Sequence, residues 1–263
     1  MRKYLQIMYV GIIQVFTYRL SFFLWRVRNV FNLIFIYFLW TSVFTKQVLF
    51  LSYTQEKLIT YILVISLLSS LILVTRTIDV GADILSGDIM NHLLKPFSFF
   101  RFIVSREFAD KFLNLFFTVI EIFILIVVLK PHIFIQNNSG AYLLLIITMI
   151  IGGIISFFVS LNLSFIAFWS NEIWAPRWIY SIFTWFLAGS FFPLDILPKS
   201  VYNLLLLTPF PYMIFLPSKV FLDGFSAALI VPIGISILWS IALFFLTKKV
   251  WETGIKNYSA YGR

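Results

Sequence analysis

The feature that most constrains this chain is its series of long apolar runs, each about as long as a lipid bilayer is thick. Residues 58–74, LITYILVISLLSSLILV, contain no charged residue. About 20 apolar residues in a helix cross the hydrocarbon core of a bilayer. Only 12% of all residues are charged, against about a quarter in soluble domains. We therefore expect an all-α integral membrane protein that forms a single transmembrane domain over residues 1–263.

The apolar runs predict six membrane-spanning helices. They lie at about residues 22–44, 58–74, 112–129, 141–169, 178–192 and 227–246. Residues 1–20 mix polar and basic side chains with apolar ones too closely for a span. Such a segment is typical of an amphipathic helix that lies in the membrane interface. A frayed span is the alternative.

Residues 193–224 differ from the other apolar segments because five prolines interrupt them. Proline breaks helices, and an open backbone cannot face lipid. We expect two short re-entrant helices that dip into the outer leaflet and pack against protein. A single broken span is the alternative, but it would give the chain an odd number of crossings.

Basic residues set the orientation of the predicted spans. Six spans with both termini on one side place 15 of the 20 basic residues on that side. The other side keeps Lys46, Lys57, Lys130, Lys199 and Lys219. Cytoplasmic loops are enriched in lysine and arginine, so both termini and residues 79–111 are expected in the cytoplasm. The basic residues flank apolar runs instead of forming a soluble basic surface, which argues against nucleic acid as a partner.

Residues 79–111 form a charged segment between the second and third spans, where we expect a soluble partner to bind. The second span is predicted to continue as a helix to Leu85. Ser86 or Asp88 would then cap a short helix that ends before Pro96. The apolar residues available to one face are Ile84, Leu85, Ile89, Met90, Leu93 and Leu94. A short amphipathic helix of this kind either fills a groove on a partner or rests on the bilayer.

No motif for ATP binding or catalysis occurs in the sequence. No glycine begins a GxxxxGK[ST] phosphate-binding loop, and HExxH, GxSxG and CxxC are absent. The chain has no cysteine. Its two histidines, His92 and His132, lie on opposite sides of the membrane in the predicted topology, so they cannot share a metal. We therefore expect neither an enzyme nor a resident cofactor or metal.

Glu121 is an acidic residue deep within a predicted span. An intramembrane carboxylate is costly unless it is paired or faces a cavity, so a functional role is one hypothesis. A hydrogen bond to a neighbouring helix is the other, and Asn32 in the first span has the same two interpretations. Arg26, near the inner end of the first span, is expected to reach the lipid headgroups. The charges at residues 101–111 have the spacing of local ion pairs on a helix.

Two stretches and the order of the segments carry a family resemblance. The stretches are SGDIMNHLLKP at 86–96 and GIKNYSAYGR at 254–263. The order is an interfacial helix, six spans, a long cytoplasmic segment between the second and third spans, and broken helices before the last. Over its whole length the chain resembles ABC-2-type permeases with the type V exporter fold. It is most similar to the small six-span permeases that are usually encoded beside a separate ATPase.

The resemblance implies an export permease in a bacterial cell membrane. Two permeases, alike or different, would pair in the bilayer, and two ATPase subunits would bind beneath them and hold the ATP and Mg²⁺. The N-terminal helix would be the elbow helix, and the short helix between the second and third spans would be the coupling helix. The residues that contact the ATPase would be Asp83, Ile84, Leu85, Asp88, Ile89, Met90, His92 and Leu93.

The resemblance also implies a translocation path lined by the first, second and fifth spans, with residues 193–224 near an extracellular gate. Candidate path residues are Asn32, Glu121 and Trp185. The alternative function is a secondary transporter or channel that uses Glu121 as an ion or proton site. That alternative predicts inverted repeats and several buried charges, and the sequence gives no convincing repeat.

Overall fold

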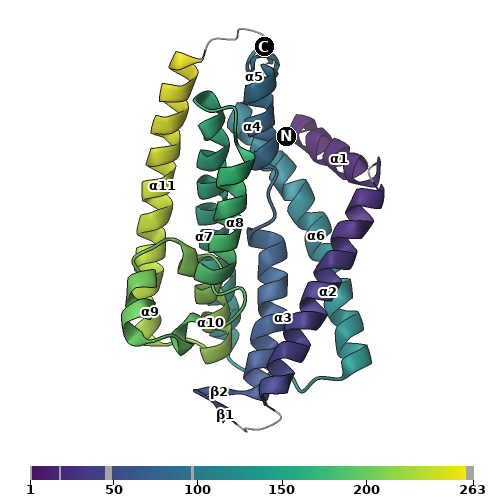
Figure 1. Cartoon of the computed structure of the whole chain (residues 1–263), viewed down its shortest axis with the longest axis vertical. Helices are drawn as coiled ribbons and strands as arrows, with labels where there is room; N and C mark the ends of the chain where they lie inside the picture. The colour runs from purple at the N-terminus through teal and green to yellow at the C-terminus, as the bar shows by residue number, and fades with distance from the viewer. Residues whose placement is uncertain (1, 18, 45–48, 96–97, 259–263) are drawn as a thin grey trace.

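The computed structural model describes residues 2–17, 19–44, 49–95 and 98–258. Pro96 and the end of the tail motif at 259–263 lie outside these ranges. Five long helices run through the molecule (Figure 1), namely α2 (Arg19–Val43), α3 (Gln55–Ile72), α6 (Phe99–Leu129), α7 (Ser139–Phe165) and α11 (Ile230–Asn257). By length and composition, five helical stretches of the described residues suit a membrane crossing. They coincide with the expected first, second, third, fourth and sixth spans, which confirms the predicted all-α membrane architecture at this level.

The helix at the expected fifth span begins and ends earlier than predicted. Its helix, α8 (Trp174–Leu187), has 14 residues, or about 21 Å of length against a hydrocarbon core of about 30 Å. It ends before Gly189, whose φ is +80° and where a Cβ would lie 2.9 Å from the Tyr61 hydroxyl oxygen. That hydroxyl donates to the Gly189 carbonyl oxygen at 2.7 Å. Position 189 requires glycine, so the chain turns there instead of continuing as helix to residue 192.

Residues 193–224 form short helices, as their prolines predict. They are η2 (Leu194–Ile196), α9 (Lys199–Leu205), η3 (Phe210–Tyr212) and α10 (Phe215–Asp223), and η4 (Ala227–Leu229) then leads into α11. They lie towards the end of the molecule that carries the antiparallel hairpin of β1 (Leu49–Phe50) and β2 (Tyr53–Thr54), seen in Figure 1. Gly152 of α7 allows this segment to pack closely, because a Cβ there would lie 2.7 Å from the Met213 carbonyl oxygen.

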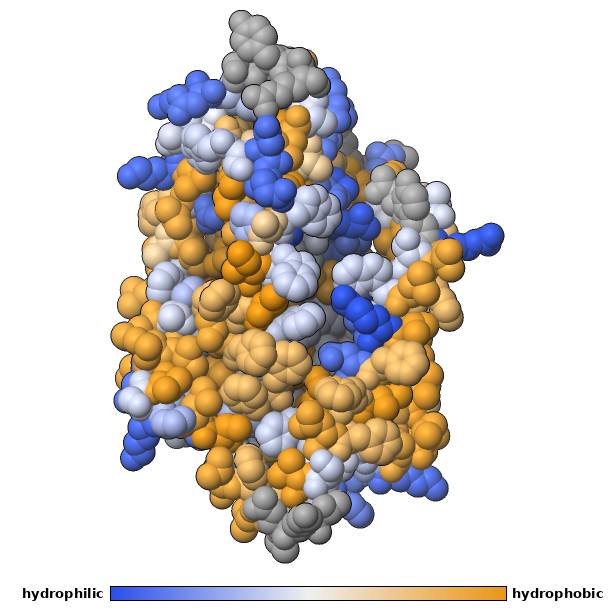
Figure 2. All heavy atoms as spheres, viewed as in Figure 1, coloured by the Kyte–Doolittle hydropathy of each residue, from blue (hydrophilic) through white to orange (hydrophobic). Residues whose placement is uncertain are grey.

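α3 is the central helix of the bundle. Its side chains Leu58, Ile59, Tyr61 and Leu68 are almost fully buried. In its most apolar window 56% of residues are buried, compared with 17% for α2, α6 and α11. The outer helices therefore expose apolar side chains, and Figure 2 shows them as a broad apolar band between hydrophilic ends. This is the surface expected of a protein that lipid surrounds.

The opposite end from the hairpin carries α1 (Arg2–Thr17), α4 (Thr77–Ser86), α5 (Ile89–Leu93) and the last turns of α11 (Figure 1). α1 is separate from α2, as predicted, and packs on α6, where the Ala109 Cβ lies 3.3 Å from the Cβ position of Gly11. The predicted continuous helix from the second span to Leu85 is interrupted. The chain leaves the helix at residues 73–76 and starts α4 anew at Thr77.

Candidate functional site

α4 and α5 form a bent pair of helices at the polar end of the molecule. Gly87, with φ of +87°, ends α4 and turns the chain into α5. The Asp88 carboxylate accepts hydrogen bonds from the Ser86 hydroxyl at 2.9 Å and the Asn91 amide at 3.3 Å. Neither Ser86 nor Asp88 caps α5 as the sequence suggested, because their side chains bond to each other instead.

The predicted partner-contact residues divide into a buried and an exposed group. Ile84 and Ile89 are 2% and 0% exposed, so they support the α4–α5 surface from beneath instead of forming it. They pack in a core cluster whose other buried members are Val80, Phe99, Ile103, Leu161, Phe165, Ala167 and Ile173. Helical periodicity placed both isoleucines on an apolar face, but this face turns towards α6 and α7.

The exposed apolar surface consists of Leu85, Met90, Leu93 and Leu94, of which Leu94 was not among the predicted contacts, and we call it the apolar tip. The first three are about two-fifths exposed and Leu94 is 81% exposed. Exposed Asp88, Asn91 and Lys95 flank them. Exposed apolar side chains at a polar end are candidates for contact with a partner or with the bilayer surface.

Asp83 and His92 hold α5 against α4. His92 Nε2 lies 3.4 Å from Asp83 Oδ2, and the imidazole ring packs 4.8 Å from the Phe102 ring. Both side chains are only partly exposed. They therefore orient the apolar tip more than they add to it.

The end of α11 packs against this region, a contact that the sequence did not predict. The Trp251 ring stacks on Phe99 with centroids 5.0 Å apart. The Tyr258 hydroxyl donates to the Ile84 carbonyl oxygen at 2.8 Å. A Cβ at Gly254 would lie 2.2 Å from the Phe168 ring in η1 (Ile166–Phe168). Gly254 and Tyr258 belong to the tail motif, so this packing explains part of that motif.

A second polar site lies between α2 and α6. Arg26 donates through Nε to Glu121 Oε1 at 2.7 Å, and its Nη2 lies 2.6 Å from Oε2. The same guanidinium bonds to Asn114 and Thr118, each at 3.1 Å. Arg26 is 7% exposed, so it does not reach the headgroups as expected, because a carboxylate one helix away binds it. Glu121 thus bonds to a neighbouring helix, as one of its two hypotheses holds, and a functional role for it stays a prediction.

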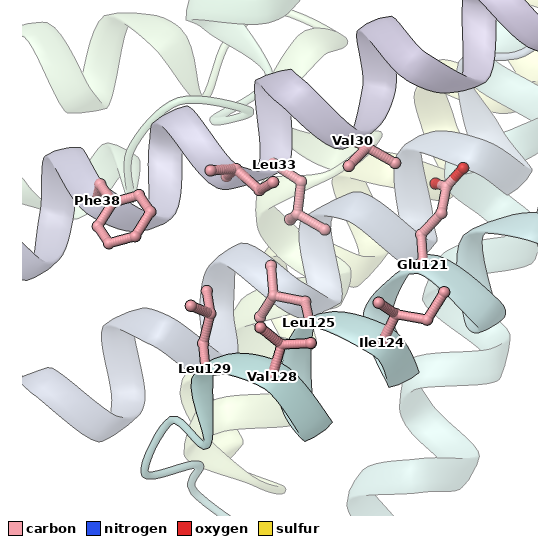
Figure 3. A pocket seen from close by; sticks show the side chains of 9 residues that line it. Val30, Leu33, Phe38, Glu121, Ile124, Leu125, Val128 and Leu129 are labelled. Atoms are coloured by element: carbon pink, nitrogen blue, oxygen red, sulfur yellow. The ribbon is translucent and has the colours of Figure 1, made fainter.

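An apolar pocket of about 140 Å³ adjoins this ion pair (Figure 3). Residues of α2 and α6 line it, among them Leu33, Leu125 and Glu121. Asn32 and Trp185 are not part of it. Both are exposed, on α2 and α8, and the Trp185 ring packs edge-on against Phe191. The three predicted path residues therefore do not converge on one site within the protomer.

A third polar cluster ties the hairpin to the short helices at the other end. The Tyr53 hydroxyl donates to Asp195 at 2.9 Å, and Lys219 bonds to Asp195 at 2.5 Å and Asp223 at 3.0 Å. Burial opposes the charge of Lys219, but the hydrogen bond and attraction of Asp195 outweigh it and raise the Lys219 pKa. Burial, with Asp195 nearby, also raises the Tyr53 pKa. Nothing in the sequence indicates that these residues meet.

Comparison with known families adds one finding. A family model described as ABC-2 family transporter protein matches residues 30–262. The curated proteins give no match.

Proposed function

The chain belongs to the ABC-2 family of transporter proteins, and from this membership we propose that it is one of two permeases that form an exporter with two ATPase subunits. As a family member it is a membrane permease component of an ABC transporter. The proposal that an ATPase binds this chain rests on the apolar tip, because its exposed side chains form a surface that a partner at the polar end can bind.

In this proposal the tip seats in a groove of the ATPase, with α5 as the coupling helix. A short helix whose apolar side chains enter a groove is a common mode of protein recognition. Leu85, Met90 and Leu93 provide the contacts, and the buried Ile84 and Ile89 keep the tip rigid. ATP and Mg²⁺ bind to the partner, since the chain has no phosphate-binding loop.

The membrane arrangement we propose has six crossings in one domain, with both termini in the cytoplasm of a bacterial cell. α8 starts the fifth crossing, and the short helices of 193–224 complete it from the outer side. Support comes from Figure 1, where α1 and the end of α11 lie at the α5 end, as an even number of crossings requires. α1 is then the elbow helix.

The second permease is expected to cover α2 and α8. Both helices expose aromatic side chains along their length, for example Phe31, Phe35 and Trp178. Asn32 and Trp185 would then face a path between the two permeases. The channel or secondary-transporter alternative loses support, because Arg26 neutralises the carboxylate that it requires.

The test is a pull-down of the tagged chain from mild detergent, with mass spectrometry of the proteins that accompany it. We expect a stoichiometric ATPase, with or without a second permease. In a variant carrying Met90→Asp and Leu93→Asp, the amount of bound ATPase is expected to fall about tenfold or more. Binding would have to bury two carboxylates in the interface, which is costly.

Val104→Asp is the matched control for the tip variant. Val104 lies near the start of α6, at the same end of the molecule, and is 38% exposed, close to the 40% of Met90 and Leu93. This variant should retain the ATPase. Equal recovery of the ATPase with the tip variant and the control would rule out docking at the tip.

A further inference from the structure

The break between α3 and α4 is held together by α6. α3 ends at Ile72 and α4 begins at Thr77, which leaves backbone carbonyl and N–H groups without partners in either helix. Lys111 of α6 donates to the carbonyl oxygens of Leu71 at 2.7 Å and Val74 at 2.8 Å. These are groups that a continuous helix would have satisfied itself.

Glu107, one turn before Lys111, satisfies the donors of the same break. It accepts from the Arg76 backbone N–H at 2.7 Å and from the Thr75 hydroxyl. Glu107 is 3% exposed, and its Oε2 lies 3.6 Å from the Lys111 ammonium. The spacing of the two residues predicted a local ion pair, and they form one, but both also reach across to another segment.

Two further charged residues of α6 extend the contact to α4. Asp110 pairs with Arg76, and Arg106 pairs with Asp79. Residues 106, 107, 110 and 111 thus present one charged face of α6 to the residues around the break. A buried ion pair often stabilises no more than an apolar pair would. Only Glu107 and Lys111 bond to the open backbone, which needs polar partners, whereas Asp110 and Arg106 pair with side chains.

The other side of α4 is fixed to α7. The Thr77 hydroxyl donates to Ser160 at 3.1 Å, and the Ser164 hydroxyl donates to the Thr77 carbonyl oxygen at 2.6 Å. Arg177 at the start of α8 donates to Ser164 at 2.6 Å. A Cβ at Gly81 would lie 3.4 Å from the Ser164 carbonyl oxygen. α4 therefore bonds to α6 and α7 through side chains, whereas α3 packs against α6 and α7 and continues into α4 through the four-residue break.

We propose that Glu107 and Lys111 make this break a mechanical joint. α4 and α5 move with α7 as one body against α3 at residues 73–76, and α6, which packs along α3 and bonds to the break, holds the two sides together. Glu107 and Lys111 are positioning residues: they hold the joint and touch no substrate. The inference rests on the proposed function, because the movement it transmits starts at an ATPase bound to the apolar tip.

The first test replaces Lys111 by Met in the complex that co-purifies with the tagged chain. We expect the ATPase to remain bound at wild-type stoichiometry, since the tip is intact, and ATP hydrolysis by the complex to change about tenfold, a common size for coupling between sites. Lys111→Arg should restore the rate, because Arg also donates to carbonyl oxygens. Wild-type hydrolysis by a Lys111→Met complex that retains its ATPase would overturn the proposal.

Lys248→Met is the matched control. Lys248 and Glu252 form a pair at the same i,i+4 spacing, with both side chains more than half exposed and 3.9 Å apart. This change should leave both binding and hydrolysis unaltered. If no ATPase accompanies even the wild-type chain, the proposed function is refuted. That outcome differs from refutation of the joint alone, in which the ATPase binds but the Lys111→Met complex hydrolyses ATP at the wild-type rate.

An engineered disulfide between α4 and α7 tests whether these two helices move together, independently of the charged residues. The chain has no cysteine of its own, and the hydroxyl oxygens of Thr77 and Ser160 are 3.1 Å apart. In Thr77→Cys with Ser160→Cys, we expect the oxidised and reduced complexes to hydrolyse ATP at equal rates, because α4 and α7 do not move apart. Strong inhibition on oxidation, reversed by a reductant, would contradict the inference.

Discussion

Removing Glu121 alone is expected to destabilise the chain more than removing Glu121 and Arg26 together. The Arg26 guanidinium makes two contacts with the carboxylate, at 2.7 and 2.6 Å, and one each with Asn114 and Thr118. A hydrogen bond to a charged group contributes about 1.5–3 kcal/mol. Glu121→Leu should therefore cost about 3–5 kcal/mol, the range measured when one member of a buried pair is removed.

The double variant, Arg26→Met with Glu121→Leu, leaves no unpaired charge and is expected to cost far less. Replacement of a whole buried pair by apolar side chains is often neutral. The assay is thermal unfolding followed by tryptophan fluorescence, with the wild type, both single variants and the double variant in one detergent. At about 2–4 °C per kcal/mol for a chain of this size, Glu121→Leu should lower the Tm by about 10 °C. The four proteins form a double-mutant cycle.

Two results would refute this reasoning. A Glu121→Leu protein with the wild-type Tm would show that the pair contributes nothing to stability. A Glu121→Gln protein that keeps its Tm and its bound ATPase, but loses ATP-driven activity, would instead support a role for Glu121 in the translocation path.

Two predictions concern the ends of the molecule. Gly254→Ala should lower stability by about 1–3 kcal/mol, the usual cost of overpacking, because the new Cβ would lie 2.2 Å from the Phe168 ring. Gly153→Ala is the control, because a Cβ at Gly153 has no atom within 4 Å. Equal Tm values for the two variants would contradict the packing. At the hairpin end, the raised Lys219 pKa means that its ion pairs stabilise the fold fully below its ordinary pKa of 10.5 and lose this effect as the pH rises through the higher folded value. The Tm of the wild type should therefore fall more between pH 10 and pH 12 than that of Lys219→Met, and equal falls would exclude the cluster as the cause.

The architecture was largely predictable from the sequence because apolar length and proline are local signals. The five long helices, the separate α1 and the short helices at 193–224 followed from them. The early end of α8 did not, because it depends on Tyr61, a residue 128 positions from Gly189. Hydropathy alone extended that helix to residue 192.

The site was predictable only in part, for a related reason. Helical periodicity groups Ile84, Leu85, Ile89 and Met90 as apolar residues, but it does not say which of them another helix covers. Arg26 and Glu121 are 95 positions apart, and nothing local indicates that α2 and α6 meet there. Gly254 and Tyr258 were visible as part of a motif, and their packing role needed the position of Phe168.

The shortness of α8 has a consequence for how the protein is made. Insertion machinery selects segments that are long and apolar enough to partition into lipid by themselves. α8 has 14 residues and carries Arg177 near its start, bonded to Ser160 and Ser164 of α7. In the proposed arrangement of six crossings, we therefore expect α8 to enter the bilayer only beside an α7 that is already in place, so that the two helices insert as a pair and the sequence of α7 determines whether α8 inserts at all.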